Sequence, residues 1–223
     1  MACRAVLFDI DGTLVHSLPL YVATINHVLE ADGLGPLDAT TVKGLFVDNI
    51  EFMIHEAFRL CGKPLYDGAY TEVLDRYMAF YLNEEHSRKY VEPYIGVPET
   101  LEALRQAGLK LGIVTNRPYE AAVGILKVMG FLSYFSEIFS IDRVTKNKPD
   151  PAHLHETLEQ MGLAPHEAIM VGDHDMDVVV SKRVGTPVII VTYGYALADP
   201  KTLGADALIE NFKELPEAIR GLA

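Results

Sequence analysis

Short runs of apolar, mostly β-branched residues alternate with longer amphipathic segments along most of the chain. The runs predict buried strands at 5–9, 109–115, 135–141, 167–172, 187–192 and 205–209. Between them, apolar residues recur at helical spacing over 98–107 and 151–161, and a glycine follows each segment. Strands that alternate with helices of this length are typical of βαβ units. The pattern therefore predicts an α/β fold, a doubly wound parallel sheet with helices on both faces.

The segment that follows the first strand has a different pattern. It contains helical periodicity over 18–31, 46–60 and 69–83, with Gly- and Pro-containing turns between these stretches. The simplest account is a small α-helical domain, residues 17–91, inserted into an α/β core made of residues 1–16 and 92–223. The apolar residues predicted to form its own core are Phe52, Ile54, Phe58 and Leu60. The polar candidates to face a substrate are Asp48, Asn49 and His55.

Charge and composition exclude several classes of partner. The 223 residues include 19 Lys or Arg and 31 Asp or Glu, a net charge of −12, and no basic run exceeds two residues. Nucleic acids and anionic membrane surfaces are therefore not expected as partners. The apolar runs are too short to span a bilayer. The two cysteines, Cys3 and Cys61, have no metal-binding or redox spacing, which favours a reducing, cytoplasmic location.

Acidic residues follow two of the predicted strands. Asp9 and Asp11 come at the end of the first strand, and Asp173, Asp175 and Asp177 follow the run 167–172. In an open parallel sheet, ligands bind outside the carboxyl ends of the strands. Carboxylates crowded there repel one another unless a cation or a proton lies between them. Hard divalent cations take carboxylate oxygens as ligands, so the pattern favours a metal site.

Two other polar segments could hold an anion at the same edge. The hydroxyl of Thr115 and the backbone N–H groups that follow it, beginning with Asn116, precede a helix, where anions bind readily. Lys148, just before a Pro-Asp-Pro helix start, could be a fixed cation. Each segment also has a simpler interpretation, as ordinary helix capping and as a solvated loop lysine.

Together these residues resemble the motifs of the haloacid dehalogenase superfamily of phosphohydrolases. The four motifs occur in order as Asp9-Ile10-Asp11-Gly12-Thr13, Thr115, Lys148-Pro149, and Gly172-Asp173 with Asp177. The resemblance covers essentially the whole chain, and the helical insertion matches the superfamily's cap domain. The surroundings, Tyr94-Ile95-Gly96-Val97 and Tyr193-Gly194-Tyr195, resemble the phosphoglycolate phosphatase branch.

The resemblance implies a Mg²⁺-dependent phosphatase that acts on a small phosphomonoester similar to phosphoglycolate. Asp9 matches the nucleophile that forms an aspartyl-phosphate, and Asp11 matches the acid and base that serves the leaving group and then the water. Residues that match the superfamily's Mg²⁺ ligands are Asp9, Asp173 and the backbone carbonyl of Asp11, with Asp177 in support. Residues that match its phosphate-binding groups are Thr115, the Asn116 N–H and Lys148. A small phosphorylated substrate is the expected partner, and either a monomer or a homodimer is compatible.

Two departures from the family's motifs and three alternative functions stay open. His16 stands where this branch commonly has an aspartate, and His174 stands beside a metal-ligand match where a small polar residue is usual. A phosphosugar mutase of the superfamily would share every motif. A phosphonate hydrolase would need a cap lysine, for which Lys43 and Lys63 are available. A non-catalytic binding protein on the same fold is disfavoured by the clustered acids.

Overall fold

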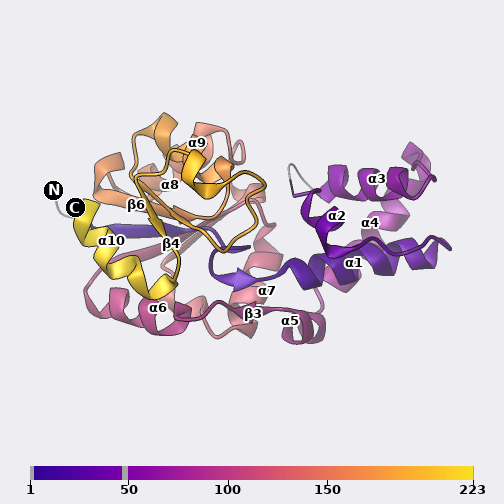
Figure 1. Ribbon diagram of the computed structural model, residues 1–223, viewed down its shortest axis with the longest axis horizontal. Coiled ribbons are helices and arrows are strands. Elements are labelled where there is room, and N and C mark those ends of the chain that lie inside the picture. The colour runs from indigo at the N-terminus through magenta and orange to yellow at the C-terminus, as the bar shows by residue number, and fades with distance from the viewer. Residues whose placement is uncertain (1–2, 47–49, 223) are drawn as a thin grey trace. The chain divides into compact units, whose positions relative to one another are not determined.

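A computed structural model describes residues 3–46 and 50–222 of the chain (Figure 1). The chain divides into two compact units. The core unit comprises Met1–His16 and Pro93–Ala223, and the helical unit comprises Ser17–Glu92.

The core unit is built on a six-stranded sheet in the part of the chain that the structure describes. The strands are β1 (Ala5–Phe8), β4 (Lys110–Thr115), β5 (Glu137–Ser140), β6 (Ala168–Gly172), β7 (Val188–Val191) and β8 (Ala207–Ile209). Their order is β5-β4-β1-β6-β7-β8, and every pair of neighbours is parallel. The predicted doubly wound parallel sheet is confirmed. Two shorter strands, β2 (Val15–His16) and β3 (Glu92–Pro93), pair with each other in a separate sheet.

Helices cover both faces of the six-stranded sheet. Figure 1 shows α8 (Pro151–Met161) and α9 (Asp175–Val184) on one side of it, and α6 (Val97–Gln106) and α10 (Leu215–Leu222) on the other. The core unit also contains α7 (Tyr119–Val128) and the short 3₁₀ helices η1 (Leu132–Tyr134), η2 (Ile141–Arg143), η3 (Pro165–Glu167), η4 (Pro200–Thr202) and η5 (Phe212–Glu214).

Strand β1 is apolar on both sides because both of its faces are covered. Ala5 and Leu7 belong to a buried cluster that includes Leu154 and Leu158 of α8. The alternate side chain Phe8 contacts the ring of Phe212, with centroids 6.1 Å apart. This is why the central strands show continuous apolar runs rather than alternation of apolar and polar residues.

The helical unit has a core of its own. Its helices are α1 (Leu18–Ala31), α2 (Ala39–Lys43), α3 (Ile50–Leu60), α4 (Asp67–Tyr81) and α5 (Glu84–Tyr90). Ile25, Ile54, Phe58 and Tyr77 are fully buried there. The prediction is wrong for Phe52 and Leu60, which are 38% and 44% exposed, because α3 turns only one face toward the other helices.

Part of the sequence interpretation of this unit is not tested by the structure. Asp48 and Asn49, two of the residues expected to face a substrate, lie outside the described residues. His55 stacks on Tyr70 within the helical unit, with ring centroids 5.0 Å apart. That the unit acts as a cap stays a prediction. No helix among the described residues is both long and apolar enough to cross a membrane.

Because Phe8 lies on the central strand, replacing Phe8 with Ala should lower the free energy of unfolding by about 3–5 kcal/mol. Urea denaturation followed by circular dichroism measures the loss. Leu208 on the edge strand β8 is 37% exposed, so Leu208→Ala is the matched control and should cost about 1 kcal/mol or less. An equal loss in the two variants would contradict this assignment of the core.

Candidate active site

The acidic residues lie where the strand order of the sheet reverses. The chain leaves β1 for β4 and β5 on one side and returns to β6, β7 and β8 on the other. Asp9 directly follows β1, and Asp173 directly follows β6, which is the neighbour of β1. Switch points of this kind are where parallel sheets bind ligands, because the loops on the two sides part there.

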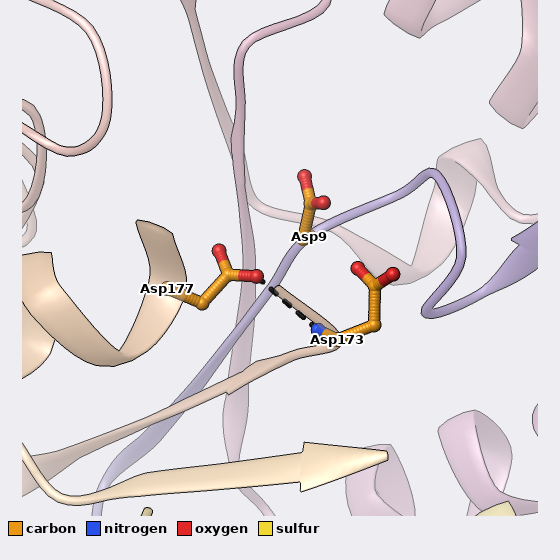
Figure 2. A group of neighbouring side chains, drawn as sticks. All are labelled: Asp9, Asp173 and Asp177. Atoms are coloured by element: carbon orange, nitrogen blue, oxygen red, sulfur yellow. Dashed lines mark hydrogen bonds between the residues drawn. The ribbon is translucent and has the colours of Figure 1, made fainter. Parts of the chain in front are cut away.

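Three carboxylates meet at this point. One oxygen from each of Asp9, Asp173 and Asp177 lies within 4.8 Å of the others. Figure 2 shows them approaching from the ends of β1 and β6 and from the start of α9. The side chains of Asp9 and Asp177 are 14% and 1% exposed, and Asp173 is 2% exposed as a residue. Asp175, the remaining acid of the run after β6, lies outside this cluster, and its side chain is 61% exposed.

The ε-ammonium of Lys148 lies between two of these carboxylates. Its Nζ is 2.7 Å from Oδ1 of Asp177 and 3.1 Å from Oδ1 of Asp9. The Lys148 side chain is only 2% exposed, so the ammonium exchanges its hydration for these two partners. The expectation that Lys148 is a fixed cation, rather than a solvated loop lysine, agrees with this position.

One lysine does not balance three clustered carboxylates, and both burial and this excess of negative charge shift their pKa values. Burial raises the pKa of Asp9 to about 6; Lys148 opposes the shift, and the charges of Asp177 and Asp11 add to it. Burial, followed by the charges of Asp9 and Asp177, also raises the pKa of Asp173 well above its usual value. Burial alone would lower the pKa of Lys148, but the attraction of Asp177 and Asp9 raises it overall. The cluster therefore favours an additional cation.

The carboxylates differ in how many of their lone pairs the protein already uses. Asp177 accepts hydrogen bonds from Lys148 and from the backbone N–H groups of Asp173 and His174, at 3.2 and 3.1 Å for the last two. Figure 2 draws the Asp173 bond as a dashed line. Asp177 is thus committed to holding its neighbours, whereas Asp9 has only the Lys148 contact among its described side-chain bonds. Asp9 is the freer ligand or nucleophile.

A backbone N–H and a side-chain hydroxyl hold Asp173 in place. Its Oδ2 accepts the N–H of Tyr195 at 2.6 Å, and its Oδ1 accepts the hydroxyl of Thr13 at 3.2 Å. Gly12 has φ = +81°, and a Cβ there would lie 2.2 Å from Oδ2 of Asp173. A Cβ at Gly194 would lie equally close to the Cβ of Asp173. These glycines let the two loops close around the carboxylate.

Asn116 has a role in the structure that sequence reasoning did not find. Its side-chain Oδ1 accepts the backbone N–H of Lys148 at 3.1 Å, and its Nδ2 donates to the Lys148 carbonyl at 2.9 Å. His153, which is fully buried, accepts the same N–H at 3.1 Å through Nδ1 and bonds the Phe139 carbonyl at 3.0 Å through Nε2. Thr115 is also buried, and its hydroxyl accepts the backbone N–H of Arg117 at 3.2 Å.

His153 is held neutral. Burial, and after it the charge of Lys148, lowers the pKa of His153 to about 4. Because Nδ1 accepts a hydrogen bond, Nε2 carries the proton and donates to Phe139. Sequence analysis gave His153 no function. A histidine at an inward position of a helix just after Lys148 was the available signal.

The Asp11 side chain is not a member of the acidic cluster. It pairs with Arg117, whose side chain is 1% exposed and which donates through Nε to Oδ2 at 3.0 Å and through Nη2 to Oδ1. Sequence analysis did not single out Arg117. An arginine two residues after the proposed phosphate-binding Thr115 was the only signal available.

His16 and His174, which depart from the family's usual residues, have different surroundings. His16 lies among tyrosines of the core unit: its Nδ1 is 3.0 Å from the Tyr195 hydroxyl and 3.5 Å from that of Tyr94. Burial, followed by the influence of Tyr195, raises the pKa of Tyr94, so its hydroxyl stays protonated. His174 contacts the carboxylate of Asp175 through Nδ1.

The raised pKa of Asp9 predicts a falling stability with pH in metal-free protein. Unfolded Asp9 loses its proton near pH 3.8 and folded Asp9 near pH 6. Because the folded state holds the proton that the unfolded state releases, the free energy of unfolding should fall by roughly 1–3 kcal/mol between these values. Asp9→Asn should remove this contribution, and Mg²⁺ should restore stability at higher pH. Thermal unfolding in chelator and in Mg²⁺ measures both. An unchanged pH slope in Asp9→Asn would contradict the prediction.

Comparison with known proteins identifies relatives of the whole chain. The family model described as haloacid dehalogenase-like hydrolase matches residues 6–191. A phosphoglycolate phosphatase of Rhodospirillum rubrum is 35% identical over 95% of this chain and 89% of its own length. An N-acetylmuramic acid 6-phosphate phosphatase of Pseudomonas aeruginosa is 33% identical over 98% of this chain and 96% of its own.

A solved structure agrees with these relatives. The crystal structure of a predicted phosphoglycolate phosphatase from Haemophilus somnus superposes with a TM-score of 0.91 at 27% identity, covering 97% of each chain. The match of the family model over most of the chain confirms the resemblance drawn from the four motifs. The chain belongs to the haloacid dehalogenase-like hydrolase family.

Proposed function

We propose that this protein is a Mg²⁺-dependent phosphatase that hydrolyses a small, phosphoglycolate-like phosphomonoester through an aspartyl-phosphate. The observation that carries the proposal is the position of the partly buried Asp9 carboxylate, which lies beside both the Lys148 ammonium and the Asp173 carboxylate at the switch point of the sheet. A carboxylate nucleophile and a phosphate ester are both anions, so their approach requires concentrated positive charge.

The predicted class of enzyme, a phosphoric monoester hydrolase, is confirmed by the curated relatives, which are named phosphatases and align with nearly the whole chain. Their named substrates differ in the organic part, since one is phosphoglycolate and another is N-acetylmuramic acid 6-phosphate. The phosphoglycolate-like substrate is therefore the finer part of the proposal. The cytoplasmic location stays a prediction.

The residues present fit a Mg²⁺ ion. Carboxylate oxygens are the ligands this hard cation prefers. Asp173 is buried, Asp9 is partly buried, and the three negative charges of their cluster exceed the one positive charge of Lys148. Asp9, Asp173 and the backbone carbonyl of Asp11 would hold the ion, and Asp177 would support them through its bonds to Lys148 and to the Asp173 N–H. When bound, the ion supplies positive charge to the phosphoryl oxygens.

The chain's own groups then divide the reaction into two steps. An Asp9 oxygen attacks phosphorus, the ester bond breaks, and Asp11 gives the leaving oxygen a proton. In the second step Asp11 takes a proton from water as the water displaces Asp9 from phosphorus and releases orthophosphate. Lys148 and the Thr115 hydroxyl, with the Asn116 N–H, would bind the phosphoryl oxygens throughout.

Asp9→Asn should abolish phosphate release, with a fall in kcat of at least about 1,000-fold, because an amide is a poor nucleophile toward phosphorus. The measurement is free phosphate released from p-nitrophenyl phosphate and phosphoglycolate in Mg²⁺. Asp175→Asn is the matched control, since it removes the same charge from an exposed position outside the cluster and should keep near-normal activity. Normal turnover by Asp9→Asn would refute the proposed function. A sugar bisphosphate formed without free phosphate would favour the phosphosugar mutase.

His153 offers a test of how Lys148 is positioned. Asn at this position can still accept the hydrogen bond from the Lys148 N–H. Gln can still donate to the Phe139 carbonyl, but it does not accept the bond from the Lys148 N–H. We expect His153→Asn to retain most of kcat and His153→Gln to lose roughly tenfold at comparable thermal stability. His155→Asn, on the exposed face of the same helix, is the control. Equal kcat losses in the two His153 variants, in step with stability, would indicate a purely structural role.

A further inference from the structure

Arg117 and Asp11 form a bidentate ion pair at the carboxyl edge of the sheet. The planar guanidinium of Arg117 donates to both oxygens of Asp11, which is the geometry that an arginine fork offers to a carboxylate. Arg117 is nearly fully buried, and Asp11 is 18% exposed. The Arg117 backbone N–H also bonds the Thr115 hydroxyl, so this arginine is anchored directly to a proposed phosphate-binding group.

This pairing conflicts with the role proposed for Asp11. To serve the leaving oxygen, an Asp11 oxygen must come within hydrogen-bond distance of that atom, yet in the structure both oxygens accept bonds from Arg117. As the general acid, Asp11 must carry a proton, and a protonated carboxyl that turns toward the leaving oxygen binds the guanidinium more weakly than the ionised, bidentate carboxylate does. The buried guanidinium is then left with weaker acceptors, which is unfavourable unless another anion takes their place.

We propose that Arg117 determines substrate specificity by binding a carboxylate of the substrate in place of the Asp11 carboxylate. The inference rests on the proposed function and extends it to a class of substrate, the phosphomonoester that carries a carboxylate close to its ester oxygen. The group that best replaces one carboxylate in an arginine fork is another carboxylate. Because Arg117 is bonded to Thr115, and its partner Asp11 lies two residues from Asp9, only a short substrate is needed to span from the phosphoryl group to Arg117.

The exchange couples recognition to catalysis. With a substrate that lacks the carboxylate, Arg117 still holds Asp11 while the leaving oxygen also needs it. The two partners then compete for the Asp11 carboxyl. A substrate with a carboxylate occupies Arg117 and leaves Asp11 able to turn toward the ester. Arg117 is thus a specificity-determining residue whose effect depends on the organic part of the substrate and not on the phosphoryl group.

The test compares phosphoglycolate with its neutral amide, 2-phosphoglycolamide, and with ethyl phosphate. In the wild-type enzyme, kcat/KM should be higher for phosphoglycolate than for either neutral substrate. Arg117→Gln should lower kcat/KM for phosphoglycolate by roughly 10- to 100-fold more than it lowers kcat/KM for the neutral substrates, as expected for lost hydrogen bonds to a charged group. Arg117→Lys keeps the buried charge without the fork and should lie between wild type and Arg117→Gln for phosphoglycolate alone.

Arg105→Gln is the matched control. Arg105 is exposed in the last turn of α6, which precedes β4 and so lies toward the opposite end of that strand from Arg117. Arg105→Gln should leave the kcat/KM values for all three substrates unchanged. Circular dichroism and thermal unfolding establish that each variant is folded. The preference of the wild-type enzyme for phosphoglycolate over the neutral substrates is measured without any variant.

A uniform loss for all three substrates in Arg117→Gln, or a carboxylate preference that survives this substitution, would overturn the proposal. So would equal wild-type kcat/KM for phosphoglycolate and its amide. If the wild-type enzyme released no phosphate from any substrate, p-nitrophenyl phosphate included, it is the proposed function that would fail.

Discussion

The buried contact of the Lys148 ammonium with Asp9 and Asp177 is the interaction on which the site depends. Like charges repel strongly in a poorly hydrated interior, so Asp9, Asp173 and Asp177 share this space only with a cation or a proton among them. Lys148 offsets one of the three negative charges, so an excess remains; burial, and after it the neighbouring carboxylates, raises the pKa of Asp9 and of Asp173. That excess is what makes the cluster suited to a divalent ion and to a substrate that arrives with one.

Much of this arrangement was predictable from the sequence because its causes are local. The apolar runs identify the strands, and parallel strands bring their carboxyl ends to one edge, so Asp9 and Asp173 had to lie close together. The contacts that orient these groups were not predictable. Asn116 and Lys148 are 32 residues apart in sequence, and Asp11 and Arg117 are 106 apart, so only the packing of neighbouring loops determines which side chain meets which.

The helical unit illustrates a different limit. Periodicity identified α1, α3 and α4, but it did not distinguish the buried face of α3, where Ile54 is fully buried, from the face that carries the exposed Phe52. Helix α5 was missed because its residues, Glu84–Tyr90, have no apolar period. Its signals were electrostatic: Asn83 caps the first turn, which is acidic, and the last turn is basic.

The most direct test of the central claim is a crystal structure of the wild-type protein grown with Mg²⁺ and beryllium fluoride, a mimic of a phosphoryl group on aspartate. The fluoroberyllate is expected on an oxygen of Asp9, with the metal against Asp9 and Asp173 and the Lys148 ammonium beside the fluorides. Density for the metal or the fluoroberyllate at another place, or an empty cluster with the three carboxylates turned apart, would contradict the claim.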